Sequence, residues 1–190
     1  CGAINSAALL LRSANDKHPR GLANSSDQVG RNYMVHLLGV MVAITKKPNP
    51  TVFEKTVGLN DFYWGDKDYP YPMGNIQSTG QILPEMLEVI FKKTVKGMTF
   101  EQMYANSTDW WFITEDLPRP DNRVTWDRNT IKISYTENNR KSFDRLQENW
   151  QQMLTGVGLC DTAIHLKVGI EGVAHQCGTC RFGTDPKTSV

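Results

Sequence analysis

The side chains of this sequence that are best suited to catalysis lie in the stretch AHQCGTCRFGTDPKTSV (residues 174–190). It places one histidine, His175, and two cysteines, Cys177 and Cys180, among glycines and small polar residues. Such a composition is typical of a loop whose backbone approaches another group closely. An imidazole at His175 could remove a hydroxyl proton near neutral pH. A purely structural histidine is the more common alternative when the residue is considered alone.

Cys177 and Cys180 form a C-x-x-C pair, which is typical of zinc sites and of redox dithiols. A zinc site needs a second pair of ligands, and neither Cys1 nor Cys160 supplies one at metal spacing, so we predict no metal site. A catalytic dithiol normally begins a helix after a strand. Here the cysteines are followed by glycine, arginine and proline instead. A dithiol or zinc redox domain stays an alternative, and two small residues in a tight loop are the simpler interpretation.

Aromatic residues offer a third interpretation, a non-catalytic carbohydrate-binding module. Trp110 and Trp111 are adjacent, and a second group lies between residues 62 and 71. Such rings could line a pocket for a sugar or an alcohol, although ordinary core and surface packing is the more common explanation for any single one of them. The second group consists of Phe62, Tyr63, Trp64, Tyr69 and Tyr71.

Composition excludes several classes of protein. The 190 residues are 39% hydrophobic and 22% charged, with a net charge of +1, which fits a folded domain. The charges are interspersed, so we expect no nucleic-acid partner. The longest apolar run, residues 37–45, is shorter than the roughly 20 residues of a membrane span. The compartment, cytoplasmic or periplasmic and secreted, is left open because a targeting segment could lie outside the sequence.

The elements that must position these residues follow from apolar periodicity. Apolar stripes predict helices over residues 83–93 and 139–155, and a shorter helix over 99–104. A buried strand is predicted over residues 34–45, and further strands over residues 73–80, 109–115 and 130–135. Strands separated by helices without a strand–helix–strand rhythm indicate an α+β fold, a mostly antiparallel sheet with flanking helices. The sequence contains no G-x-G-x-x-G motif.

Three segments together resemble the glucose–methanol–choline oxidoreductase family. Residues 175–190 are similar to its His-Pro-x-Gly-Thr element, with Gln176 in place of the usual proline. Residues 2–13 are similar to its second signature, a Gly-Ala pair before a leucine-rich helix, with Ala7 in place of proline and Ala14 in place of glycine. A third similarity, over residues 29–36, rests on Val29, Gly30, Asn32 and His36. The three segments occur in the order that the family has.

The resemblance implies an enzyme that uses FAD to oxidise a CH–OH group of an alcohol, sugar or polyol to a carbonyl by hydride transfer. His175 matches the position of the catalytic base that takes the hydroxyl proton. The positions implied for contact with FAD are Gly2, Ala3, Asn32, Gly178 and Thr179.

The resemblance also implies a division of the chain. Residues 1–35 would be the tail of an FAD-binding domain, 36–170 a substrate-binding domain, and 171–190 a return into the FAD domain, so both ends would be pieces of a Rossmann-like fold. The family's dinucleotide fingerprint and the second member of its catalytic pair, a His or Asn, would lie before Cys1 and after Val190. We therefore expect the chain to work with the remainder of its own polypeptide and to be inactive alone.

Overall fold

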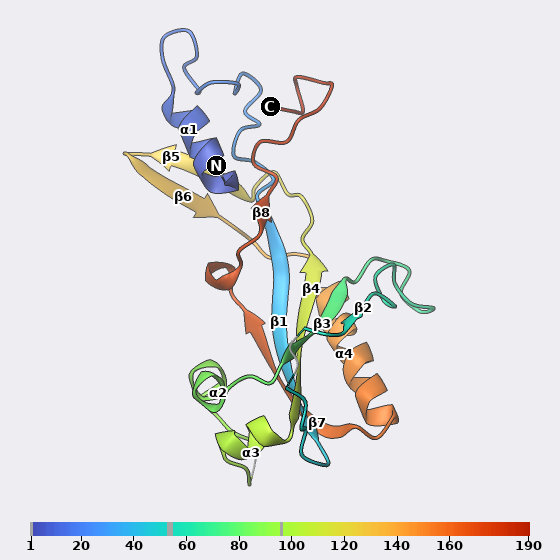
Figure 1. Cartoon of the computed structure of the whole chain (residues 1–190). Coiled ribbons are helices and arrows are strands. Elements are labelled where there is room, and N and C mark those ends of the chain that lie inside the picture. The colour runs from blue at the N-terminus through green and yellow to red at the C-terminus, as the bar shows by residue number, and fades with distance from the viewer. Residues whose placement is uncertain (1, 53–54, 96) are drawn as a thin grey trace. The chain divides into compact units, whose positions relative to one another are not determined.

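The structure, a computed structural model, describes residues 2–52, 55–95 and 97–190 (Figure 1). It divides into two compact units. The first unit consists of the described residues of Cys1–His36 together with Asp116–Asn138 and Val173–Val190. The second unit consists of the described residues of Leu37–Glu115 and Asn139–Gly172. Among the described residues, no helix combines the length and the apolar character needed to cross a bilayer.

The second unit is built on a sheet with the strand order β2-β3-β4-β1-β7. Strand β1 (Met34–Thr45) enters it from the first unit and pairs antiparallel with β7 (Cys160–Val168). Strands β2 (Gly58–Leu59), β3 (Asn75–Gly80) and β4 (Ser107–Glu115) pair antiparallel with one another in sequence order. A short 3₁₀ turn, η1 (Ile170–Gly172), follows β7.

Helices cover both faces of this sheet, which explains the continuous apolar run in β1. Helix α4 (Arg140–Gly156) buries Phe143 and Leu146 against Met41 of β1. On the opposite face, α2 (Pro84–Phe91) and α3 (Phe100–Ala105) pack on the neighbouring β1 side chains Val40 and Val42. Alternate residues of β1 therefore enter two separate apolar clusters, as the period of a strand requires.

The first unit contains helix α1 (Ala3–Arg12), the hairpin of β5 (Arg123–Asp127) and β6 (Thr130–Ser134), and the two-residue strand β8 (Gln176–Cys177). Helix α1 packs against β5. Strand β8 pairs with the first residues of β1 (Figure 1). The predicted α+β architecture with antiparallel sheets and flanking helices is confirmed. The assignment of the two ends to a Rossmann-like domain stays a prediction.

Asp109 is a buried carboxyl of the second unit whose protonation should affect stability. Its side chain is 1% exposed and accepts the Ile82 amide at 2.6 Å. Burial raises its pKa from 3.8 to about 6, against the opposing effect of that hydrogen bond. Between these two values the native state binds more protons than the unfolded state, so the free energy of unfolding falls as the pH rises through this window.

Replacing Asp109 by Asn removes the charge and keeps an acceptor for the Ile82 amide. The unfolding free energy of the variant minus that of the wild type should increase by about 1–3 kcal/mol from pH 4 to pH 7.5. Urea denaturation at the two pH values measures this difference. Asp61→Asn, at an exposed carboxylate of the same unit, is the matched control. A difference that is the same at both pH values would contradict the prediction.

Candidate functional site

His175 stands immediately before β8, where the chain returns to the start of β1. In the antiparallel register of these strands, Met34 faces Cys177 and Val35 faces Gln176. One further step places His36 opposite His175, and their side chains meet. Nε2 of His36 and Nδ1 of His175 are 3.1 Å apart, with the two rings edge to face. The His175 side chain is exposed, whereas His36 is partly buried.

The three motif segments meet in this same unit. The amide of Gly30 donates to the carbonyl of Thr179 at 2.8 Å. The Thr179 hydroxyl in turn donates to the carbonyl of Ala3 at 2.6 Å. Gly178 lies against the carbonyl of Asn32. The structure therefore brings together Ala3, Asn32, Gly178 and Thr179, which are far apart in the sequence.

Three of these residues are enclosed by the chain itself. Asn32 is 4% exposed and Thr179 only 1%. Gly178 has a φ of +91°, and a Cβ added there would lie 1.8 Å from the Asn32 oxygen. Gly2 is different, because it is exposed and an added Cβ would meet no described atom within 4 Å.

A buried carboxylate fixes the start of β1 beside the histidines. Asp116 is 3% exposed and accepts the amide of Val35 at 3.2 Å and that of Leu117 at 3.0 Å. Burial raises its pKa, and the hydrogen bond from Val35 acts in the opposite direction. Burial, followed by the nearby Asp116 charge, raises the pKa of both Tyr33 and Tyr135. The backbone that carries His36 is thus held by hydrogen bonds within its own unit.

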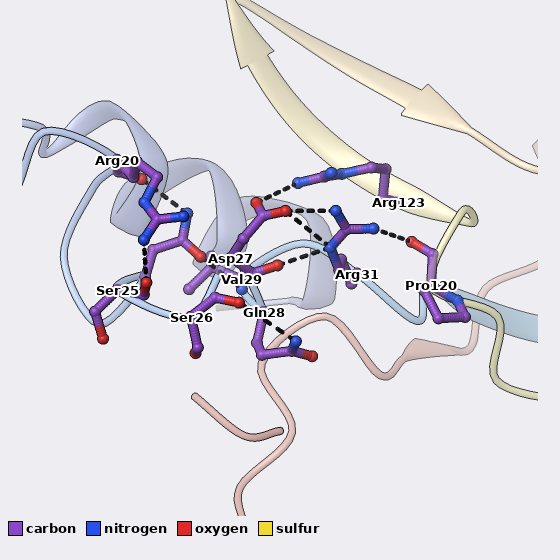
Figure 2. Close-up of polar contacts among 10 residues, drawn as sticks. Arg20, Ser25, Ser26, Asp27, Gln28, Val29, Arg31, Pro120 and Arg123 are labelled. Carbon is purple, nitrogen blue, oxygen red and sulfur yellow. Dashed lines mark hydrogen bonds and ion pairs between the residues drawn. The ribbon is translucent and has the colours of Figure 1, made fainter. Parts of the chain in front are cut away.

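A second polar cluster, drawn in Figure 2, lies on the loop of residues 27–31, which includes Gly30. The Asp27 carboxylate pairs with the guanidinium groups of Arg31 and Arg123, the latter at 3.2 Å. Arg31 also donates to the carbonyl of Pro120 at 3.1 Å. The hydrogen bond from Arg31, with a smaller contribution from Arg123, lowers the pKa of Asp27 against the effect of burial. This cluster ties the loop to the segment that leads into β5.

Asp27→Asn should lower the unfolding free energy by about 0.5–1 kcal/mol, because the ion pairs are partly exposed. Asparagine tolerates the positive φ of 59° at this position, so the substitution removes the charge and one of the two acceptor oxygens without straining the backbone. The loss should shrink in 1 M salt, where the Debye length is about 3 Å. Asp144→Asn, which removes the exposed pair with Arg140, is the control, with a smaller loss expected. Equal losses in the two variants, measured by urea denaturation, would contradict the assignment.

Neither cysteine of the C-x-x-C pair forms a disulfide with another described residue. Cys177 lies on β8 and Cys180 in the turn that follows, so neither begins a helix. Burial raises the pKa of Cys180, which disfavours a thiolate there. In the described part of the chain, no three or more His, Cys, Asp or Glu side chains gather as a metal site would require.

The two adjacent tryptophans are packing residues of the second unit. Trp110 is 7% exposed, and its ring meets the edge of Trp150 with 4.7 Å between centroids. Trp111 packs on the apolar cluster at the opposite face of the sheet. Trp110 is therefore buried, and Trp111 is partly buried. Trp64, in contrast, is 78% exposed.

Sequence reasoning assigned no role to His36, although this residue belongs to one of the three motif segments. Its pairing with His175 joins residues that are 139 positions apart. The available signal was a histidine at the last position of one motif segment, residues 29–36, and another at the first position of a second, residues 175–190. Without the pairing of β1 with β8, nothing in the sequence places the two rings side by side.

Comparison with known proteins gives relatives that are oxidoreductases by name. The chain is 27% identical over 209 residues to paromamine 6'-oxidase of Streptomyces fradiae, which covers 100% of the chain and 36% of that protein. It is 25% identical over 216 residues to 2-methyl-1,2-propanediol dehydrogenase of Mycolicibacterium austroafricanum, which covers 98% of the chain and 38% of that protein. No protein-family model matches the chain.

A shorter and closer similarity adds to these. Over 33 residues, 17% of the chain, the sequence is 61% identical to the fructose dehydrogenase large subunit of Gluconobacter japonicus, of which the match covers 6%. The chain thus spans little more than a third of the full-length relatives, 36% and 38% of their lengths. The similarity as a whole supports an enzyme of the oxidoreductase type.

Proposed function

We propose that this chain is part of an FAD-dependent oxidoreductase of the glucose–methanol–choline family, which oxidises a CH–OH group of an alcohol, sugar or polyol to a carbonyl. The observation that supports this best is the meeting of the three motif segments in one unit, with the exposed His175 ring 3.1 Å from His36. The similarity of the whole chain to an oxidase and a dehydrogenase supports the class of reaction.

Two features of the first unit fit a flat cofactor that contains a diphosphate. Gly2 is exposed, with open space where a side chain would lie. Helix α1 begins at Ala3 without an acidic residue in its first turn, and the N-terminal amides of a helix favour phosphate groups. We therefore assign direct contact with FAD to Gly2 and Ala3. When bound, FAD supplies the hydride acceptor.

The other three residues implied for FAD binding would hold the loop after β8 in place. Asn32, Gly178 and Thr179 are enclosed by described atoms of the chain, and their packing connects the loop after β8 to α1 and to the start of β1. Their contribution would be to fix where His175 stands. A base must be held within hydrogen-bond reach of the proton that it removes.

The proton transfer would be the task of His175. Its Nδ1 faces His36, so Nε2 is the nitrogen that can meet a hydroxyl group. A neutral imidazole accepts a proton near neutral pH. The exposed ring leaves the substrate free to approach this nitrogen.

The full-length protein provides the test. It should purify with the absorbance of a flavin, which an alcohol should bleach in the absence of oxygen. The first compounds to try are paromamine, 2-methyl-1,2-propanediol and fructose, which the names of the relatives contain. Simple primary alcohols extend the panel. A full-length protein without flavin, or a flavin that no member of the panel bleaches, would contradict the proposal.

A further inference from the structure

The contact between His36 and His175 has a direction that matters for the chemistry. A hydrogen bond between two imidazoles needs one N–H group and one lone pair. If His175 donates from Nδ1, its Nε2 keeps a lone pair and can accept a proton. If His36 donates from Nε2 instead, the proton of a neutral His175 is on Nε2, and this nitrogen is no longer a base. Only the first arrangement is competent for proton removal.

We propose that His36 is a positioning residue that accepts the Nδ1–H of His175 and thereby holds His175 in the tautomer with a free lone pair on Nε2. The proposal rests on the proposed function for the use to which Nε2 is put. The tautomer of a histidine is set by the hydrogen bond that its other nitrogen makes. The 3.1 Å separation of Nε2 of His36 from Nδ1 of His175 is suited to such a bond.

The backbone makes His36 a well-fixed partner. Its neighbour Val35 donates its amide to the buried Asp116 carboxylate at 3.2 Å. Tyr33 donates its amide to the carbonyl of Asn122 at 2.9 Å. The pairing of β8 with the first residues of β1 fixes the backbone next to His175. All of these contacts lie within the first unit, so the orientation of the pair is determined there.

The pair also acts during the proton transfer itself. The substrate O–H bond breaks, its electron pair stays on oxygen, and the proton forms a new N–H bond at Nε2 of His175. The ring becomes an imidazolium ion, and its Nδ1–H continues to donate to the lone pair of His36. A hydrogen bond from a charged donor is stronger than one from a neutral donor, so His36 stabilises the product of this transfer more than its starting state.

The tautomer can be measured without any catalysis. In protein labelled with ¹⁵N in its histidine rings, long-range ¹H–¹⁵N correlation spectra at a pH where His175 is neutral should show the proton of His175 on Nδ1. His36→Gln, whose amide oxygen can still accept, should keep that tautomer, and His36→Phe should shift the population toward Nε2–H. His165→Gln, a change on β7 in the second unit, is the control and should alter nothing. An Nε2–H tautomer in the wild type, or no shift in His36→Phe, would overturn the proposal.

Kinetics of the flavin-containing full-length protein supply a second readout. His36→Phe should lower the limiting rate of flavin reduction roughly 10- to 100-fold, a fraction of the full effect of a general base, with little change in substrate affinity. His36→Gln should recover most of that rate. If His175→Ala retains rapid reduction, the proposed function fails. If His175→Ala abolishes reduction while His36→Phe reacts at the wild-type rate, the function stands and the role of His36 fails.

Discussion

Replacing His175 by alanine in the full-length protein is expected to lower the limiting rate of flavin reduction by about 10²- to 10⁴-fold, the usual contribution of a general base. The ring of His175 is the only part of this residue that can accept a proton, and alanine has no group that could replace it. The loss should be in the rate constant for reduction, because the proton is transferred in that step. Stopped-flow measurement of flavin absorbance without oxygen gives this constant directly.

Flavin binding should survive the same substitution. The His175 side chain is exposed, and its one described side-chain partner is His36, so alanine leaves the packing of Asn32, Gly178 and Thr179 intact. The flavin absorbance of the purified variant checks this expectation. His165→Ala serves as the control. It removes a ring that is hydrogen-bonded to Gln151 in the second unit, and the flavin of this variant should be reduced at the wild-type rate. Rapid reduction in His175→Ala would contradict the assignment of the base.

The elements that the sequence predicted most closely are those with a strong apolar signal. Strand β1 has the same limits in the prediction and in the structure, Met34–Thr45, because most of its residues are apolar and those from Leu37 onward are covered on both faces. Helix α4 was predicted at residues 139–155 and is observed at Arg140–Gly156, because Phe143, Leu146 and Trp150 recur at helical spacing on its buried face.

Two of the strands that escaped prediction, β7 and β5, did so for identifiable physical reasons. Strand β7 lies at the edge of its sheet and is mostly polar or exposed, so it lacks the alternation that marks a half-buried strand. Strand β5 is short and belongs to a two-stranded hairpin. Its turn has two consecutive residues with positive φ, Arg128 and Asn129, in place of the Asn-Gly pair that usually identifies such a turn.

The candidate site was predictable only in part for a related reason. His175 and its glycine-rich loop stand out through local composition, whereas the role of His36 depends on the register of β8 against β1. Register is set by contacts between distant segments, and a short strand of two residues gives almost no sequence signal for it. The same holds for segment Asp116–Asn138, which groups with both ends of the chain although it lies in the middle of the sequence.

Gly178→Ala is expected to be the most destabilising substitution near the site. The added Cβ would lie 1.8 Å from the Asn32 carbonyl oxygen, a backbone atom that cannot turn aside. The φ of +91° is also unfavourable for a residue with a side chain. Strain of this kind costs about 1–3 kcal/mol and the overlap about as much again, so the unfolding free energy should fall by roughly 3 kcal/mol or more.

Gly158→Ala separates the cost of the backbone conformation from the cost of the steric overlap. This glycine also has a positive φ, +71°, but an added Cβ there would meet no described atom within 4 Å. Its loss should be limited to about 1–2 kcal/mol from the backbone conformation. Urea denaturation of both variants measures the difference, and equal losses would show that the loop can relax away from Asn32.

Hydrogen exchange should locate the effect of Gly178→Ala in the first unit. The amide of Gly30 donates to Thr179, the residue next to the substitution, and should lose protection. The amides that pair β1 with β7 in the second unit should keep theirs, because their partners are unchanged. A shifted loop would also displace the backbone of β8, on which the register of His175 against His36 depends. Gly178 therefore affects proton removal through the position of the His175 ring, three residues away. In the variant, His175 should lose its preference for the Nδ1–H tautomer even where flavin remains bound.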